Sequence, residues 1–279
     1  MSATGGRTRR MPPALGTAIG VLLLVVMLFP LYWMVNASLL PSSDLVKSSP
    51  TWIPLHGTLQ GYRNAFASQG GHLAVSLLIS CGSVLLTLGI AAPAAFGLSQ
   101  RRAPLGRALT FALLIAQMIP GVVMANSLYV AISRLGLVNS PVALILADST
   151  LCVPFSILIL HAFMGSIPRA LSEAALVDGA SRLRIFRSVI LPVSRNAVLT
   201  AGLFSFLFTW GDFLFAVTLT TQDDRAPVTV GIYRFIGAHL SDWNSVMATG
   251  IIASLPAAVL LVFAQKYVAA GVGAGAIKE

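Results

Sequence analysis

Long apolar runs alternate with short polar connections along the whole chain. Six of these runs reach the ~20 residues that a helix needs to cross a bilayer at ~1.5 Å per residue. They lie at 14–37, 73–99, 108–132, 140–165, 197–221 and 246–268. No segment between them has the pattern of a separate soluble domain. We therefore predict an all-α membrane protein with six transmembrane helices, in which residues 1–279 form a single domain.

The composition and the charge refine this picture. Hydrophobic residues make up 56% of the chain and charged residues only 10%, which excludes an ordinary soluble domain. The net charge of +9 does not indicate nucleic-acid binding, because the basic residues sit beside the spans and form no long run. If the amino terminus is cytoplasmic, thirteen of the 18 Lys and Arg residues lie in cytoplasmic segments. Since cytoplasmic loops carry such an excess, we expect both termini and the loop 166–195 in the cytoplasm.

The loop between the fourth and fifth spans is a polar island in an apolar chain. It contains the stretch EAALVDGASRLRIFRSVILP at 173–192. We expect a first helix capped by Ser166, with Pro168 in its first turn and Glu173 favourable near its amino end. Gly179 stops this helix, because glycine adopts the left-handed conformation at low cost.

A second helix follows directly in the same loop. Ser181 is placed to cap it, and Leu183, Phe186 and Ile190 fall on one stripe. Pro192 ends it before the fifth span. From the residues alone, this helix-turn-helix fits an element that binds anionic lipid as well as it fits a protein contact.

The island resembles the EAA-x3-G-x9-I-x-L-P signature of ABC importer permeases. It matches this signature at 173–175, 179 and 191–192, with Val189 where isoleucine is usual. In that family the loop is a coupling helix that docks in a cleft of the ATPase subunit. The resemblance assigns this role to Glu173, Ala174, Ala175, Asp178, Gly179, Leu191 and Pro192.

Other stretches are similar to the maltose-type carbohydrate permeases within that family. They include FPLYWMVNASLLP at 29–41, TWIPLHGTLQGYRNAF at 51–66 and the tail QKYVAAGVGAGAIKE at 265–279. One departure is Trp-Gly-Asp-Phe at 210–213, where the family often has Trp-Asn-Asp/Glu-Phe. The resemblance implies a bacterial or archaeal cell-membrane protein that imports an oligosaccharide or related polyol by alternating access. It also implies three partners: a second, unlike permease subunit, an ATPase dimer and an extracytoplasmic sugar-binding protein.

The chain has no nucleotide-binding motif of its own. A phosphate-binding loop needs a glycine-rich turn that ends in Gly-Lys-Ser/Thr. Lysine occurs only at 47, 266 and 278, and none of the three follows a glycine. Because we also find no catalytic or metal-binding pattern, we expect no enzyme activity and no catalytic, cofactor or metal site. ATP and magnesium would bind the partner ATPase.

Candidate residues for a translocation path lie inside the spans. Asp148 and Asp212 are the only acidic residues there, and a carboxylate within a membrane is a functional hypothesis by default because its burial is costly. Amide and aromatic groups suited to sugars complete the candidate set, which is Gln117, Asn126, Tyr129, Asp148, Trp210 and Asp212. A purely structural role for the two acids, in which each pairs with a polar neighbour and fixes helix packing, stays open.

A proton-coupled secondary transporter is the alternative function. It would use Asp148 and Asp212 as proton sites, and broken helices with internal symmetry would be expected. Pro120-Gly121 fits a break in the third span, but we find no matching break in the other half and no internal repeat. The coupling signature also has no role in a proton-driven carrier. The residues therefore favour the importer.

Overall fold

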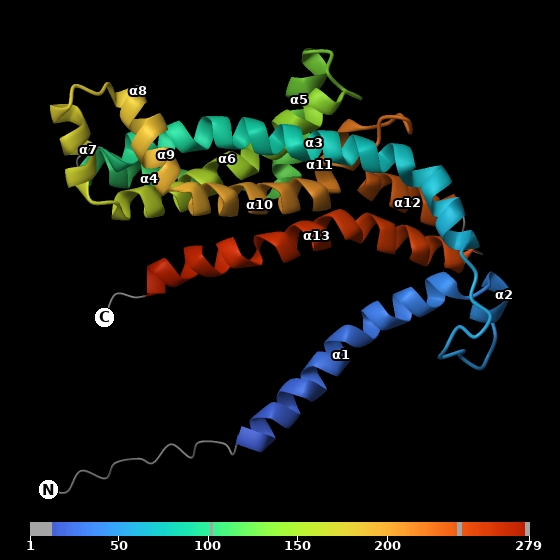
Figure 1. Cartoon of the computed structure of the whole chain (residues 1–279). Helices are drawn as coiled ribbons and strands as arrows, with labels where there is room; N and C mark the ends of the chain where they lie inside the picture. The colour runs from blue at the N-terminus through green and yellow to red at the C-terminus, as the bar shows by residue number, and fades with distance from the viewer. Residues whose placement is uncertain (1–12, 101–102, 239–241, 277–279) are drawn as a thin grey trace, which may run out of the picture.

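The computed structural model describes residues 13–100, 103–238 and 242–276, and these residues form helices joined by turns and loops (Figure 1). The helices of the first half are α1 (Pro13–Leu39), α2 (Ser42–Leu45), α3 (Gln60–Ser99), α4 (Ala103–Ala116), α5 (Gly121–Arg134) and α6 (Pro141–Ser166). Those of the second half are α7 (Arg169–Val177), α8 (Arg182–Ile185), the π-helix η1 (Phe186–Ile190), α9 (Leu191–Val193), α10 (Arg195–Gly211), α11 (Leu214–Leu219), α12 (Val228–Ala238) and α13 (Trp243–Ala276). The predicted all-α fold class is confirmed.

Among the described residues, four continuous helices are long and apolar enough to cross a membrane, namely α1, α3, α6 and α13. Two bent pairs of helices are long enough when each pair is counted as one span. The helices α4 and α5 meet at 91°, and the segment 182–193 meets α10 at 79°. Counting both pairs gives up to six spans, which is the number that the apolar runs predict.

The third predicted span, 108–132, is not one helix, because its middle is unwound between α4 and α5. Pro120 has no N–H to donate to the preceding turn and disfavours a helical conformation at Ile119. The fifth predicted span, 197–221, is also interrupted, since α10 ends at Gly211 and α11 starts at Leu214. The second span is longer than its apolar run, because α3 begins at Gln60 and not near residue 73.

The core of the molecule is formed by α3, α6 and α10, which run side by side (Figure 1). Ala91 and Ala95 of α3, Ala147 of α6 and Ala201 of α10 are fully buried where these helices meet. Small side chains let helix backbones approach closely, and this substitutes for the hydrophobic driving force that a bilayer does not provide. The core is therefore held by close packing of small residues.

Helix α1 lies apart from this core and touches the rest of the structure mainly through α13 (Figure 1). Its side chains are exposed over most of its length and become buried only from Asn36 onward. There the Nδ2 of Asn244 in α13 donates hydrogen bonds to the carbonyl oxygens of Ser38, at 2.8 Å, and of Leu40, at 2.7 Å. The first helix is thus attached near its carboxyl end alone.

Candidate functional site

The polar loop between α6 and α10 lies at one end of the helical core (Figure 1). Helix α7 begins at Arg169 after Pro168, and no side chain caps it. The expected cap by Ser166 is wrong, because this serine is the last residue of α6 and its hydroxyl donates to the carbonyl of Phe163. The expected turn at Gly179 is confirmed, since its φ of +77° is left-handed and its N–H donates to the carbonyl of Leu176.

The second half of the loop differs in detail from the expected single helix. The hydroxyl of Ser181 accepts from the N–H of Arg184 at 3.3 Å, which confirms the predicted cap. A π-helix then replaces the α-helix just before Pro192, because that proline cannot donate the next hydrogen bond. The wider turn places Ile185 and Ile190, which are five residues apart, on the same buried face, while Leu183 in α8 is exposed.

The loop presents a mixed apolar and acidic surface. Leu171, Leu176 and Val177 of α7 are exposed, and Val177 is 89% exposed. Glu173 and Asp178 lie among them and are exposed too. Exposed apolar side chains in a polar loop are typical of a contact with a protein or with the membrane surface. The other side of α7 is anchored, since Ser172 is buried and Ala175 packs on the core.

The structure brings the two intramembrane acids together. Asp148 on α6 and Asp212 after α10 line a small cavity of about 10 Å³ with Ser76 and Thr209. Asp148 is 1% exposed, and its Oδ1 has no hydrogen-bond partner among the described residues. A space of this volume holds about one water molecule. The pair therefore forms a closed polar site rather than a wide passage.

Asp212 has a clear local role at the interruption between α10 and α11. Its carboxylate accepts hydrogen bonds from the N–H groups of Phe215, at 3.3 Å, and Ala216, at 2.9 Å. These amides belong to the first turn of α11 and have no partner within the helix. A negative group is also favourable at the amino end of a helix. Asp212 thus stabilises the start of α11.

The other candidate path residues lie in different places. Trp210 is buried against α13, where its Nε1–H donates to the carbonyl of Ala253 at 3.0 Å. Asn126 and Tyr129 lie on exposed faces of α5. Gln117 lies in the unwound segment before α5. The six candidates therefore do not surround one cavity within this chain. The face of α5 that packs on α6 and α11 carries Ala125 and Ile132 instead of the candidate residues.

Gln117 lines a larger cavity of about 580 Å³ between the unwound segment, α6 and α10. Three phenylalanines line it as well, namely Phe155, Phe204 and Phe208. The sequence analysis missed them because an apolar residue in an apolar span carries no signal of its own. The one available hint is that Phe204 and Phe208 are four residues apart, which places them on one face of α10.

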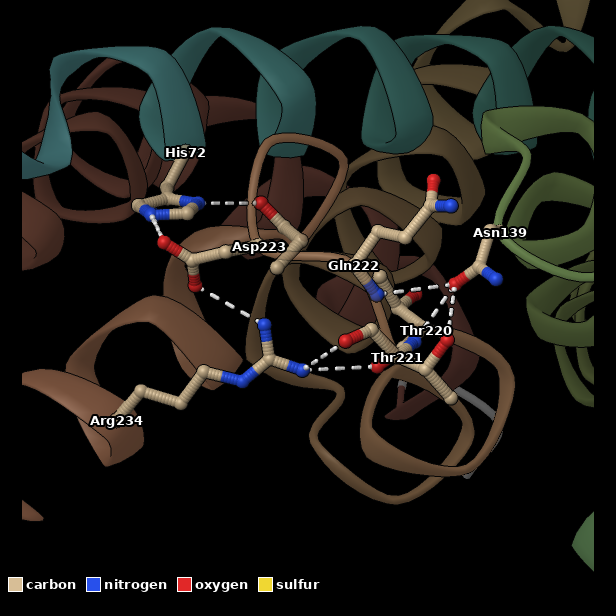
Figure 2. Close-up of polar contacts among 8 residues, drawn as sticks. His72, Asn139, Thr220, Thr221, Gln222, Asp223 and Arg234 are labelled. Atoms are coloured by element: carbon tan, nitrogen blue, oxygen red, sulfur yellow. Dashed lines mark hydrogen bonds and ion pairs between the residues drawn. The ribbon is translucent and has the colours of Figure 1, made fainter.

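A network of polar contacts holds the loop 220–227 at the opposite end of the molecule (Figure 2). The side-chain oxygen of Asn139 accepts hydrogen bonds from the N–H groups of Thr221 and Gln222. Arg234 forms an ion pair with Asp223 at 3.0 Å and donates to the carbonyl of Thr220. Contacts from the α5–α6 connection and from α12 therefore fix this loop from two sides. Asn139 adopts a φ of +63°, which the sequence alone did not indicate.

The described residues contain no group of histidine, cysteine and acidic side chains that is arranged to hold a metal ion. The two cysteines lie apart, with Cys81 exposed and Cys152 buried. Within these residues the structure has an exposed apolar and acidic surface on the polar loop, a buried acid pair and an aromatic cavity.

Comparison with known proteins gives relatives of similar length. The chain is 34% identical to the sulfoquinovosyl glycerol transport system permease SmoH of Agrobacterium fabrum, over 92% of this chain and 91% of the relative. It is 31% identical to the trehalose/maltose transport system permease MalG of Thermococcus litoralis, over 92% of this chain and 94% of the relative.

The fold also matches a solved structure. A chain from the crystal structure of a bacterial ABC transporter involved in the import of the acidic polysaccharide alginate superposes with a TM-score of 0.80. The match covers 95% of this chain and 99% of that chain at 20% identity, so it establishes the shared architecture. Residues 86–273, which contain α6, α10, the polar loop and the residues that line the aromatic cavity, match the family described as binding-protein-dependent transport system inner membrane component. The chain belongs to this family of transport permeases.

Proposed function

We propose that this chain is a transmembrane permease subunit of an ABC importer and that it passes a carbohydrate into the cytoplasm. The observation that carries the proposal is the polar loop. It presents the exposed apolar residues of α7 beside Glu173, followed by the left-handed turn at Gly179. Such a surface fits a coupling helix that docks on a separate ATPase.

The energy for transport would come from that ATPase. No lysine of the chain follows a glycine, so the Gly-Lys-Ser/Thr element of a phosphate-binding loop does not occur in it. ATP and magnesium would therefore bind a partner pair of ATPase subunits. Closure of this pair would push the coupling surface, namely Glu173, Ala174, Ala175, Asp178, Gly179, Leu191 and Pro192.

The proposed substrate is an oligosaccharide or a related polyol. The two relatives carry names of transport systems for sulfoquinovosyl glycerol and for trehalose and maltose. These molecules share sugar rings with many hydroxyl groups. A translocation path for such a substrate needs hydrogen-bonding groups and aromatic surfaces, and Gln117 is the candidate residue that lines a cavity large enough for a sugar.

The proposed orientation places the polar loop and both termini in the cytoplasm. The beginning of α1 and the end of α13 lie toward the same end of the molecule as α7 (Figure 1). The excess of basic residues in the corresponding segments supports this side as the cytoplasmic one. The loop 220–227 would then face the extracytoplasmic side, where a sugar-binding protein delivers the substrate.

Transport by alternating access would require a second, unlike permease subunit. The break between α4 and α5 supports this proposal, because interrupted helices in a membrane are tolerated where they are buried in protein or line a water-filled cavity. A proton-driven carrier is not favoured, since the chain belongs to a family that depends on a binding protein.

Purification of the complete complex tests the proposal. We expect the chain to co-purify with an ATPase and a second permease. In vesicles, a sugar-loaded binding protein should stimulate ATP hydrolysis, and a panel of sugars should identify the substrate. Uptake that needs a proton gradient and no ATPase would overturn the proposal.

A further inference from the structure

The aromatic cavity between the unwound segment, α6 and α10 combines aromatic rings and an amide side chain with the volume of a small-molecule site. Its volume of about 580 Å³ lies within the ~300–1,000 Å³ of small-molecule sites. The acid pair encloses about 10 Å³, which is too small for a sugar. A third cavity, between α3, α10 and α13, is of similar volume, about 540 Å³, but its lining has no hydroxyl, amide or charged side chain.

The backbone next to this cavity is not a continuous helix. The segment between α4 and α5 is unwound at the middle of the proposed third span. Free backbone groups at membrane depth must be buried in protein or must face a water-filled space. The N–H groups of Gln117, Met118 and Ile119 donate to carbonyl groups of α4, while the side chains of Met118 (79% exposed) and Ile119 are not covered by this chain. In the assembled transporter the segment must therefore meet a partner subunit or water, and the labelling experiment below decides between the two.

The side chains of the cavity suit a sugar in particular. Phe155 and Phe204 pack edge to face at 5.7 Å between ring centroids, which holds both rings in place. Phe208 lies one turn further along α10 and is exposed toward the cavity. The negative face of an aromatic ring attracts C–H groups, which a sugar ring presents on its flat side. The amide of Gln117 can donate to and accept from sugar hydroxyls.

We propose that this cavity is the sugar-contact wall that this chain contributes to the translocation path. The rings of Phe155 and Phe208 stack against the sugar, and Gln117 hydrogen-bonds its hydroxyl groups. This assignment rests on the proposed function and replaces a general candidate set with one site.

Uptake measured in vesicles that contain the complete complex tests the stacking role. In Phe155→Ala and Phe208→Ala we expect the sugar imported per ATP hydrolysed to fall about two- to tenfold, the effect of one aromatic contact. The KM for sugar should stay unchanged, because the binding protein captures the substrate. Phe208→Tyr keeps the ring and should restore transport. The matched control is Phe111→Ala, since Phe111 is 64% exposed on α4 and does not line the cavity.

Thiol labelling tests for water and for sugar directly. In a chain with Gln117→Cys, Cys81→Ser and Cys152→Ser, a membrane-impermeant thiol reagent should label position 117, and transported sugar should slow the labelling. The proposal is overturned if position 117 is not labelled or if sugar has no effect. Loss of the second permease from Phe155→Ala complexes, together with no labelling, would show that the rings form a subunit contact instead.

The outcomes separate this inference from the proposed function. If the unaltered complex imports no sugar, the proposed function fails. If it imports sugar and the two Phe→Ala variants behave like Phe111→Ala, only the assignment of the cavity fails. If a Phe→Ala variant does not assemble, the thiol labelling decides whether the cavity binds sugar, because the labelled chain keeps both Phe155 and Phe208.

Discussion

Gly179 is the residue at which the proposed coupling depends most directly on backbone conformation. Its φ of +77° costs an L-residue about 1–2 kcal/mol, and proline cannot adopt it at all. We expect Gly179→Pro to insert in the membrane and to lose uptake, because the turn after α7 is lost. Glu173→Lys should also insert and lose uptake, since it reverses a charge on the docking surface.

Membrane fractionation and sugar uptake measure these effects. Gly165→Ala is a matched control, because this glycine lies in α6 and an added Cβ would meet nothing within 4 Å. Normal uptake in either loop variant would mean that the loop is not the coupling element.

Asp212 allows a test that separates hydrogen bonding from charge. Its carboxylate accepts from two amides of α11, and asparagine keeps an acceptor at the same place. We expect uptake to survive in Asp212→Asn and to fall sharply in Asp212→Leu, which leaves both amides unpaired at a cost of about 1–3 kcal/mol each. Uptake assays and thermal unfolding in detergent check this. Complete loss in a well-folded Asp212→Asn would revive the proton carrier, because an amide cannot titrate.

At this scale the sequence indicated some residues and hid others. Gly179 and Ser181 were predictable, because a left-handed turn and a helix cap each depend on local residue type. Phe155 and Phe208 were not, because their role comes from a cavity formed by segments far apart in the chain. Asp212 was recognised as unusual, but its bond to α11 depends on a helix start that no local pattern indicated.

Helix α13 gives a prediction at the scale of the element. Asp242 precedes this helix, and its Oδ1 accepts from the N–H of Ser245 at 3.4 Å and from the hydroxyl of Ser42 at 2.8 Å. Partial burial raises the pKa of Asp242, but hydrogen bonds from Ser245 and Ser42 outweigh it, so the pKa is lowered. A lowered pKa means that the ionised form stabilises the folded state above the unfolded pKa of about 3.9.

We therefore expect Asp242→Ala to lose about 0.5–2 kcal/mol of stability at neutral pH, the range of helix caps. Asp242→Asn should lose less, because it retains an acceptor. The difference between the unaltered chain and Asp242→Asn should disappear as the pH falls below about 4 through the lowered pKa. Thermal unfolding in detergent at several pH values measures this, with the exposed Asp224→Ala as the control. If the difference in stability between the unaltered chain and Asp242→Asn stays the same at low pH, the ionised carboxylate is not the source of the stabilisation.

The positions of the helices were largely predictable, while their continuity was not. Hydrophobicity over ~20 residues locates a span but does not say whether it is straight. Pro120 predicts a break in the third span, but the angle of 91° between α4 and α5 does not follow from the residue pattern. The end of α10 at Gly211 lies inside an apolar run, and hydrophobicity alone does not reveal it. The π-helix before Pro192 is likewise not indicated by the residue pattern.

The tail belongs to the scale of the whole assembly. Helix α13 continues to Ala276, well beyond the segment that packs on α1 and α3 (Figure 1). The proposed orientation places this tail on the side where the ATPase would dock. We expect deletion of residues 270–279 to weaken co-purification with the ATPase or to alter its regulation, with membrane insertion retained. Unchanged assembly, ATP hydrolysis and uptake would instead favour a free chain end.

The isolation of α1 has a consequence for the order in which the molecule is made. Its main partner, α13, begins about 200 residues later in the chain. At synthesis rates of about 5–20 residues per second, α1 waits roughly 10–40 s before that partner leaves the ribosome. During this time it is surrounded by lipid alone, so every face must be apolar enough to remain there unaided. The uniform hydrophobicity of this helix is then required because α1 is synthesised long before α13, independently of its role in the finished transporter.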